Sequence, residues 1–578
     1  MPGLVSQSKV AQLDVSPLEP VDAQLGRNGE QFELRNVNKG RSPAPKKAVS
    51  LFPFSSSFAK PSPDRISCGK RRGSTEIDKP NLEVNSPNNP DLGPFLLKLA
   101  RDTIASGEGL NKALEYAIRA CKSFKSCTAE NGEPSLDLAR SLHVTAAIYC
   151  SLGRYQEAMQ LLERAVAVPD IRRGPDHALA AFSGCMQLGD THSILGYVVQ
   201  AIDCYTRGLD VQMNALGDSD PRIAETCRCL AEALVEAMRF DQAETLCKKI
   251  LEIHGEHSAP ASVEEASDRR LIAIVYDAKG DYDAALEHLV LASMAMIANG
   301  HVGEVAFIDL SIGNAYLALG RYDEAVFSYQ KALTVFKSTK GDNHPVVALV
   351  LVRLADLYYR TGKRRDSKLY CENALRIYTK RSQGAIPENV AVGLMEIASL
   401  YEALEGPEEA LKLLQKALKV LEDVPGQLCM VAGIEAQMGV MNYIVGKFGE
   451  SRSSFYSAAS KLREIGMEKS AFFGMVLNQL GLACVQLLKI DEAAELFEEA
   501  MEILEQEYGS KHQDTLGVYS NLAAIYDAMG RVEEAIHLLE HVLRIREEGH
   551  GTPNPDVDEE RKRLAALLKE ADRSKNRT

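Results

Sequence analysis

Two histidines, His254 and His257, come closest to a chemical site by type and spacing, because they lie three positions apart in HGEH. A zinc site needs three or four Cys, His or acidic ligands at short spacings. The sequence supplies no further Cys or His at such a spacing, and its twelve cysteines include no C-x-x-C pair. We therefore expect both histidines to be solvated connector residues, and we predict no metal site.

Motifs for catalysis and cofactor binding are absent from the sequence. It contains no G-x-x-x-x-G-K-[ST] loop, no G-x-G-x-x-G after a strand, no H-E-x-x-H and no G-x-S-x-G. GVMNYIVGKF (Gly439–Phe448) is the nearest approach to a phosphate-binding loop, but its spacing is wrong and it follows a predicted helix. We predict a non-enzymatic protein without catalytic residues or cofactors.

A basic cluster, KRRGS (Lys70–Ser74), is a candidate modification site. Basic residues ahead of a serine suit a basophilic kinase, so Ser74 is a phosphorylation candidate whose phosphate would cancel the local positive charge. Without the phosphate, the same cluster would suit an acidic polymer. Such clusters are also common in flexible tails that have no binding role.

The cluster lies in a head segment that differs in composition from the rest of the chain. Residues 1–90 contain 13 Lys/Arg against 9 Asp/Glu, which leaves 53 against 71, a net charge of −18, for residues 91–578. The head is rich in Pro, Ser and Asn and has no sustained apolar period, so it lacks the apolar surface that offsets the entropy lost on folding. We predict that residues 1–90 are disordered.

Targeting and membrane signals are also absent. No apolar run approaches the roughly 18 residues that span a bilayer, and the start MPGLVSQSKV has neither a basic nor an apolar signal-peptide region. We expect a soluble, unsecreted protein whose cysteines remain reduced.

A hexapeptide, GRYDEA (Gly320–Ala325), recurs along the remaining chain as GRYQEA, GDYDAA and GRVEEA. The residues aligned with Ala325 are Ala158, Ala201, Ala243, Ala285, Ala325, Ser367, Ala410, Ser451, Ala493 and Ala535. They are separated by 43, 42, 42, 40, 42, 43, 41, 42 and 42 positions. A period in this range indicates an array of stacked structural repeats.

Each repeat carries the pattern of a helical hairpin. The first helix has a small residue and, three positions later, a large one, commonly a tyrosine such as Tyr276, Tyr316, Tyr358 and Tyr526. A glycine four positions further on suits the left-handed residue that ends a helix, and these glycines are Gly153, Gly280, Gly320, Gly362 and Gly530. Acidic residues open the second helix, and the aligned Ala lets the two helices cross closely.

This pattern, small-x-x-Tyr, then Gly-x-Tyr-x-x-Ala, then x-x-x-aromatic-x-x-Ala, resembles the tetratricopeptide (TPR) signature. The usual TPR repeat has about 34 residues. The longer period here, with connectors such as LGDSDPRIA, KGDNHPVVA and YGSKHQDTL, resembles kinesin light chains. The resemblance implies an all-α TPR superhelical solenoid of about 10–11 hairpins. We divide the chain into a disordered head (1–90), a degenerate first hairpin (91–130), ten repeats (131–552) and a capping helix with a tail (553–578).

One departure separates the sequence from kinesin light chains, which carry a heptad coiled coil ahead of the repeats. Residues 1–90 contain many prolines and no such heptads. A Ser/Pro/Lys-rich head on this solenoid is similar to the plant kinesin-light-chain-related proteins. That resemblance implies a cytoplasmic scaffold on cortical microtubules that works with basic, calmodulin-binding IQ-domain scaffold proteins and supports anchorage of cellulose-synthase tracks.

The resemblance also implies where partners bind. In the family, a stripe on the first helices faces a groove and contacts peptides, which matches here Arg228, Arg270, Asn314, Arg353, Asn478 and Asn521. Arg and Asn at these places would hold an acidic or extended peptide through hydrogen bonds. An ordinary solvated helix face is the other interpretation. The acidic repeats would repel nucleic acid and favour basic partner proteins.

Two other functions stay open. A kinesin light chain-like cargo adaptor that regulates a motor fits the repeats but not the head. A cochaperone that clamps the terminal carboxylate of a heat-shock protein would need Lys and Asn on successive first helices. The position four before Asn314 is Leu310, so the required cation is missing there.

Overall fold

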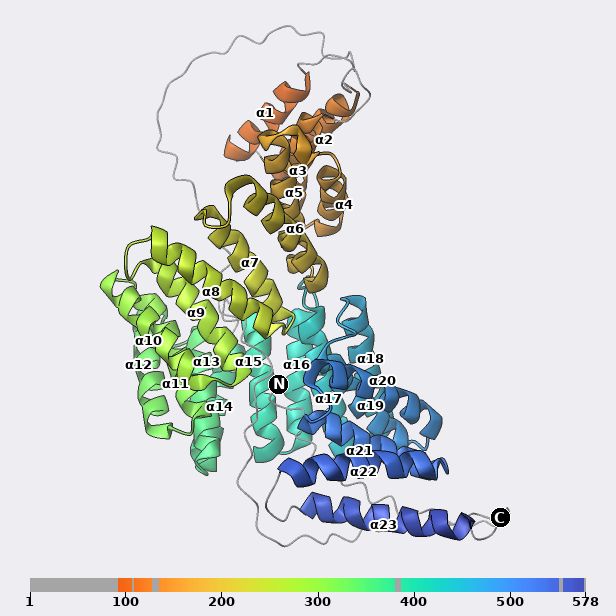
Figure 1. Cartoon of the computed structure of the whole chain (residues 1–578). Coiled ribbons are helices and arrows are strands. Elements are labelled where there is room, and N and C mark those ends of the chain that lie inside the picture. The colour runs from red at the N-terminus through yellow and green to blue at the C-terminus, as the bar shows by residue number, and fades with distance from the viewer. Residues whose placement is uncertain (1–91, 107–108, 127–134, 380–385, 550–554, 576–578) are drawn as a thin grey trace. The chain divides into compact units, whose positions relative to one another are not determined.

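The computed structural model describes residues 92–106, 109–126, 135–379, 386–549 and 555–575, which form helical hairpins joined by short connectors (Figure 1). All regular secondary structure in these ranges is helical. The fold is therefore the all-α TPR solenoid that the repeat predicts. The predicted disorder of residues 1–90 and the candidate Ser74 lie outside the described residues.

Each hairpin pairs an odd-numbered first helix with an even-numbered second helix. The first helices are α1 (Leu92–Ser106), α3 (Leu136–Ser151), α5 (Pro175–Ile194), α7 (Arg222–Glu236), α9 (Val263–Lys279), α11 (Val302–Ala318), α13 (Pro345–Arg360), α15 (Pro387–Leu404), α17 (Leu428–Ile444), α19 (Ala471–Gln486) and α21 (Gln513–Ala528). The second helices are α2 (Leu110–Ser126), α4 (Tyr155–Val166), α6 (Val198–Leu216), α8 (Phe240–His257), α10 (Tyr282–Ala298), α12 (Tyr322–Lys340), α14 (Arg364–Thr379), α16 (Pro407–Leu421), α18 (Phe448–Glu464), α20 (Ile490–Tyr508) and α22 (Val532–Gly549). A short 3-10 helix, η2 (Ile171–Arg173), precedes α5, and α23 (Pro555–Lys575) packs on α22.

The chain divides into two compact units. One comprises residues 52–350 with 423–427, and its described part holds α1–α12 and the first residues of α13. The other comprises residues 1–51, 351–422 and 428–578, and its described part holds the remainder of α13 and α14–α23. Within each unit, successive hairpins bury their apolar faces against one another, as in the cluster that joins α6, α7, α8 and α9.

The turn inside each hairpin depends on a left-handed residue. Gly320 has a φ of 74°, and the N–H of Arg321 donates to the carbonyl of Tyr316 over 2.9 Å. This bond satisfies a carbonyl at the end of the first helix. The guanidinium of Arg321 also lies 4.5 Å from the centre of the Tyr316 ring, and Arg154, Lys363 and Arg531 make the equivalent cation–π contact in their repeats.

The crossing of the two helices follows a rule that links two positions of each repeat. The first position lies twelve residues before the aligned residue (Ala325 and its equivalents), and the second lies four residues after it. Where the first is Gly, the second is aromatic, as in Gly189–Tyr205, Gly313–Tyr329, Gly439–Phe455 and Gly481–Phe497. Where that residue is Ala, the partner is Leu or Cys, as in Ala146–Leu162, Ala231–Cys247, Ala273–Leu289, Ala355–Cys371, Ala398–Leu414 and Ala523–Leu539. All these residues are buried.

Steric contact explains the rule. A Cβ added at the four glycines would lie only 2.5, 2.5, 2.8 and 2.6 Å from the nearest ring carbon, far inside van der Waals contact. An aromatic ring therefore leaves no room for alanine on the facing helix, whereas Leu and Cys do. The aligned residues, Ala325 and its equivalents, are all fully buried at the same crossing.

Two repeats have no glycine at the left-handed turn, and there the chain stores strain. Leu488 has a φ of 58° and Met238 a φ of 60°, at positions where other repeats have Gly320 or Gly530. The left-handed conformation costs a residue with a Cβ about 1–2 kcal/mol. Leu488 is 79% exposed, so its side chain offsets little of this cost by packing.

Replacing Leu488 by glycine is therefore expected to raise the free energy of unfolding by about 0.5–1 kcal/mol. Urea unfolding of the two proteins checks this prediction. Leu487→Gly is the control, because Leu487 has a φ of −94° and gains nothing from glycine. A Leu488→Gly protein that unfolds at the same or a lower urea concentration than the parent would show that the turn is unstrained.

Candidate partner-binding surface

The six residues predicted to contact partners all lie on first helices: Arg228 on α7, Arg270 on α9, Asn314 on α11, Arg353 on α13, Asn478 on α19 and Asn521 on α21. We call them the first-helix set. The reference point on each first helix is the Gly or Ala at the helix crossing, twelve positions before the aligned residue. Arg228, Arg270 and Asn478 lie three positions before it, Arg353 and Asn521 lie two positions before it, and Asn314 lies one position after it. Three positions before and one position after the crossing residue are four apart and share a helix face. Two positions before it lies one residue further along the helix and is turned away from that face by about 100°. The set therefore does not form one continuous stripe.

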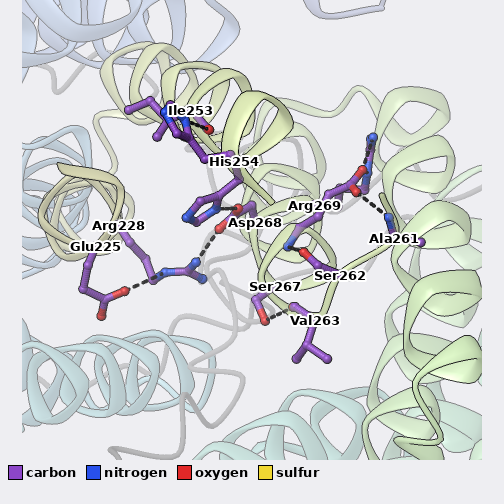
Figure 2. Close-up of polar contacts among 12 residues, drawn as sticks. Glu225, Arg228, Ile253, His254, Ala261, Ser262, Val263, Ser267, Asp268 and Arg269 are labelled. Carbon is purple, nitrogen blue, oxygen red and sulfur yellow. Dashed lines mark hydrogen bonds and ion pairs between the residues drawn. The ribbon is translucent and has the colours of Figure 1, made fainter. Parts of the chain in front are cut away.

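Arg228 is held by a buried carboxylate from the next repeat. Its guanidinium pairs with one oxygen of Asp268 on α9, and His254 Nδ1 on α8 lies 2.5 Å from the other oxygen (Figure 2). Asp268 is only 1% exposed. Burial raises the pKa of Asp268, while the Arg228 charge and the hydrogen bond from His254 act in the opposite direction. The cluster joins three consecutive helices.

The same geometry corrects the prediction for the two histidines. His254 and His257 lie in the last turn of α8, which continues through Gly255 to His257, and neither is a connector residue. His254 is largely buried against Asp268, whereas His257 is exposed, as predicted, and its Nδ1 lies 2.9 Å from the Ile253 carbonyl oxygen. The helix continues because Gly255 keeps right-handed backbone geometry, so the connector begins only at Ser258.

Arg353, Asn478 and Asn521 are also engaged inside the chain. Arg353 Nη2 donates to Glu396 Oε1 on α15 over 2.6 Å, and the side chains are 12% and 11% exposed. Burial raises the pKa of Glu396 and the Arg353 charge opposes this rise. Asn521 Nδ2 donates to Asn478 Oδ1 over 2.9 Å, and both residues are buried. A partner could reach the two asparagines only after α19 and α21 separate.

Asn314 belongs to the crossing between the helices of its own hairpin. The Tyr329 hydroxyl donates to Asn314 Oδ1 over 2.8 Å, and the Tyr205 hydroxyl donates to Asp190 Oδ1 over the same distance. In the two repeats whose aromatic residue is Phe, the equivalent positions hold Val440 and Leu482. Asn314 therefore satisfies a buried tyrosine hydroxyl, which is a structural role.

Arg270 is the most available member of the first-helix set. Its Nη1 donates to Glu304 Oε2 on α11 over 3.0 Å, and the two side chains are 24% and 47% exposed. A solvent-exposed pair of this kind contributes little to stability, so a competing carboxylate or carbonyl group can replace Glu304 at small cost. Among the six, Arg270 is best placed to hold a partner peptide.

The sequence pattern does not indicate the acidic partners of these arginines. Asp268, Glu304 and Glu396 each lie 34 to 43 positions after the arginine that they bind. Second helices make the same kind of contact, since Arg452 pairs with Glu492 and Arg463 with Glu499. A search for opposite charges about one period apart would have found them, because stacking places such residues on neighbouring repeats.

Glu232, one turn after Arg228 on α7, gives this region a pH dependence. Burial raises the pKa of Glu232 to about 7 from its ordinary 4.5, although the Arg228 charge opposes the rise. A raised pKa means that the fold favours the protonated form, so stability is fully present below pH 4.5 and is lost as the pH rises toward 7.

We expect Glu232→Gln to remove this loss. The unfolding free energy of the variant minus that of the parent should be about 2 kcal/mol larger at pH 8 than at pH 5. Urea unfolding at the two pH values measures the gain. Glu256→Gln, on α8 and with an exposed side chain, serves as the control. An identical pH dependence in the parent and in Glu232→Gln would contradict the assignment.

The described residues provide neither a metal site nor a membrane-spanning helix. Across the ranges that the structure describes, no group of three or more His, Cys, Asp or Glu could hold a metal ion. None of the helices described is long and apolar enough to cross a bilayer.

Comparison with known protein families supports the repeat assignment. Models of the tetratricopeptide repeat match residues 138–169, 304–380 and 472–548. These matches fall on hairpins α3–α4, α11–α14 and α19–α22, and so include the hairpin that contains Gly313 and Tyr329.

Similar proteins include two from Arabidopsis thaliana. The chain is 61% identical to kinesin light chain-related 1 over 90% of this chain and 87% of that protein. It is 54% identical to kinesin light chain-related 3 over 87% of this chain and 77% of that protein. Among solved structures, BtubC from P. vanneervenii is similar at 22% identity, with a TM-score of 0.37 over 40% of this chain and 93% of that chain.

Proposed function

The chain belongs to the kinesin light chain-related family of TPR proteins, and from this premise we propose that it is a non-enzymatic scaffold associated with cortical microtubules in the cytoplasm. It binds microtubules directly or through basic, calmodulin-binding IQ-domain scaffold proteins. In this position it supports the anchorage of cellulose-synthase tracks. The observation that carries the proposal is the 61% identity to kinesin light chain-related 1 over 87% of that protein.

Charge supports an indirect link to the microtubule. Residues 91–578 carry a net charge of −18, and tubulin tails are acidic, so the repeats and the polymer repel each other at long range. A basic scaffold protein would be attracted to both and would connect them. Arg270 supplies a point at which an extended segment of that scaffold can be held by hydrogen bonds, in exchange for Glu304.

Two other functions receive different support. The relatives are named for kinesin light chains, which keeps a cargo adaptor that regulates a kinesin motor as the second candidate. The cochaperone has less support, because Leu310 is buried in α11 and supplies no cation for a carboxylate clamp.

Co-sedimentation of the full chain with microtubules tests the proposal. The chain should stay mostly in the supernatant when mixed with microtubules alone at physiological salt, and should pellet when an IQ-domain scaffold protein is added. Pelleting without the scaffold would mean direct binding, which the proposal includes. A chain that never pellets with or without the scaffold, but pellets with a kinesin heavy chain, would replace the proposal by the motor adaptor.

A further inference from the structure

The outer face of α10 carries apolar side chains that nothing in the described chain covers. Val290, Met294 and Ile297 are 43%, 62% and 58% exposed, and Leu291 beside them is also exposed. Residues at this spacing lie along one side of a helix. We call Val290, Leu291, Met294 and Ile297 the α10 ridge. Contiguous exposed apolar surface of this kind usually marks a site of interaction.

The other repeats show that the fold does not require this ridge. Val290, Met294 and Ile297 follow the aligned Ala285 by five, nine and twelve positions. In α12 the equivalent residues are Gln330, Thr334 and Lys337, and in α14 they are Glu372, Arg376 and Thr379. In α16, α20 and α22 they are Gln415, Lys419, Glu422, Glu498, Glu502, Glu505, Glu540, Arg544 and Glu547. A second helix in this architecture is therefore built equally well with polar residues at these positions, and α10 is the one second helix with three large aliphatic side chains there.

The charges around the ridge select the kind of partner. Asp283 and Glu287 continue the same face toward the start of α10, both are exposed, and neither has a hydrogen bond or ion pair within the part of the chain that is described. The helix contains no Lys or Arg. A partner that covers the ridge therefore meets negative charge at one end, which favours basic residues there.

The size of the ridge favours a short helical segment over a second copy of the chain. From Val290 to Ile297 the ridge is about 12 Å long at 1.5 Å per residue, or two helical turns. A stable interface between two folded proteins needs roughly 800 Å² on each side, which four side chains do not supply. An amphipathic helix that places apolar residues at i, i+4 and i+7 against another helix matches the ridge in length and shape.

We propose that the α10 ridge is a docking site for a basic amphipathic helix of a partner protein, with the basic residues directed toward Asp283 and Glu287. This site lies on a second helix, whereas the first-helix set lies on first helices. The two surfaces can therefore act independently, and the α10 site does not depend on microtubule association.

A binding experiment with the full chain tests the proposal. The probe is a fluorescently labelled 18-residue synthetic helix of lysines with leucines at i, i+4 and i+7, followed by anisotropy. The variant Val290→Gln, Met294→Thr, Ile297→Thr takes the residues of α12 and α14 at the same positions and leaves the charge unchanged. We expect the variant to bind the probe at least about tenfold more weakly, because three buried apolar contacts are lost. Its unfolding midpoint should be unchanged, since all three side chains are exposed in the free chain.

Three controls make the result decisive. A probe with serines in place of leucines keeps its charge and should bind the parent chain as weakly as the original probe binds the variant. Tyr456→Gln changes the same position on α18 and should leave the affinity unchanged. Asp283→Asn with Glu287→Gln should weaken binding and reduce its dependence on salt.

Two outcomes would overturn the proposal. If the triple variant binds the leucine probe as tightly as the parent chain, the ridge is not the binding surface. If sedimentation shows a dimer of the parent chain that the triple variant abolishes, the ridge is occupied by a second copy.

Discussion

Replacing Gly313 by alanine should lower the free energy of unfolding by about 2 kcal/mol, although alanine is the better helix former by about 1 kcal/mol. The added Cβ would lie 2.5 Å from Cε1 and 2.6 Å from Cδ1 of Tyr329. The ring is fully buried and its hydroxyl is bonded to Asn314, so it cannot move aside freely. Urea unfolding of the full chain measures the loss.

A control and a second background make this prediction specific. Gly303 lies in the same helix, α11, with nothing within 4 Å of an added Cβ, so Gly303→Ala should stabilise the chain slightly. In a Tyr329→Leu background, Gly313→Ala creates the Ala–Leu crossing that four other repeats have. There, Gly313→Ala should change sign and stabilise the chain by about 1 kcal/mol. Equal destabilisation in both backgrounds would contradict the steric explanation.

Removal of the buried carboxylate at Asp268 should have an effect of similar size. Asp268→Asn removes the buried charge partner of Arg228, which then keeps only the exposed Glu225, and breaking a buried pair in this way costs about 3 kcal/mol. His254 also loses the carboxylate to which it is bonded. Thermal or urea unfolding checks the expected loss.

Glu304→Gln is the matched control. It also removes the acidic partner of an arginine of the first-helix set, Arg270, but this ion pair is exposed to solvent. It should change the unfolding free energy by less than about 0.5 kcal/mol. If Asp268→Asn and Glu304→Gln are equally mild, the Arg228–Asp268–His254 cluster is not a structural junction between repeats.

The hairpin architecture could be predicted from the sequence because each repeat encodes its own local contacts. The helix-ending glycines, such as Gly320, and the fully buried crossing residues, such as Ala325, act within about twenty residues of chain, so their period is readable directly. The link between Gly313 and Tyr329 is also present in the sequence, but a pattern that groups Gly with Ala as small residues does not show it. Only the distance from the added Cβ to the ring separates them.

The candidate site was less predictable, because it depends on how one repeat stacks on the next. Nothing in the local pattern around Arg228 specifies that its partner is Asp268, forty positions later. The end of α8 is hard to read from the sequence for a related reason: glycine often ends a helix, but Gly255 lies inside α8, two positions before its last residue, and His254 next to it is bonded to Asp268. The burial of Asn478 and Asn521 likewise follows from contact between α19 and α21.

The most direct test of the account is the affinity of the full chain for a basic IQ-domain scaffold protein, measured by calorimetry for the parent, Arg270→Ala and Glu304→Gln. If Arg270 holds a segment of the partner, Arg270→Ala should bind about tenfold more weakly. Glu304→Gln should bind more tightly, because it releases Arg270 from its internal partner. If both variants bind as the parent does, Arg270 is not part of the partner surface, and the central claim is wrong.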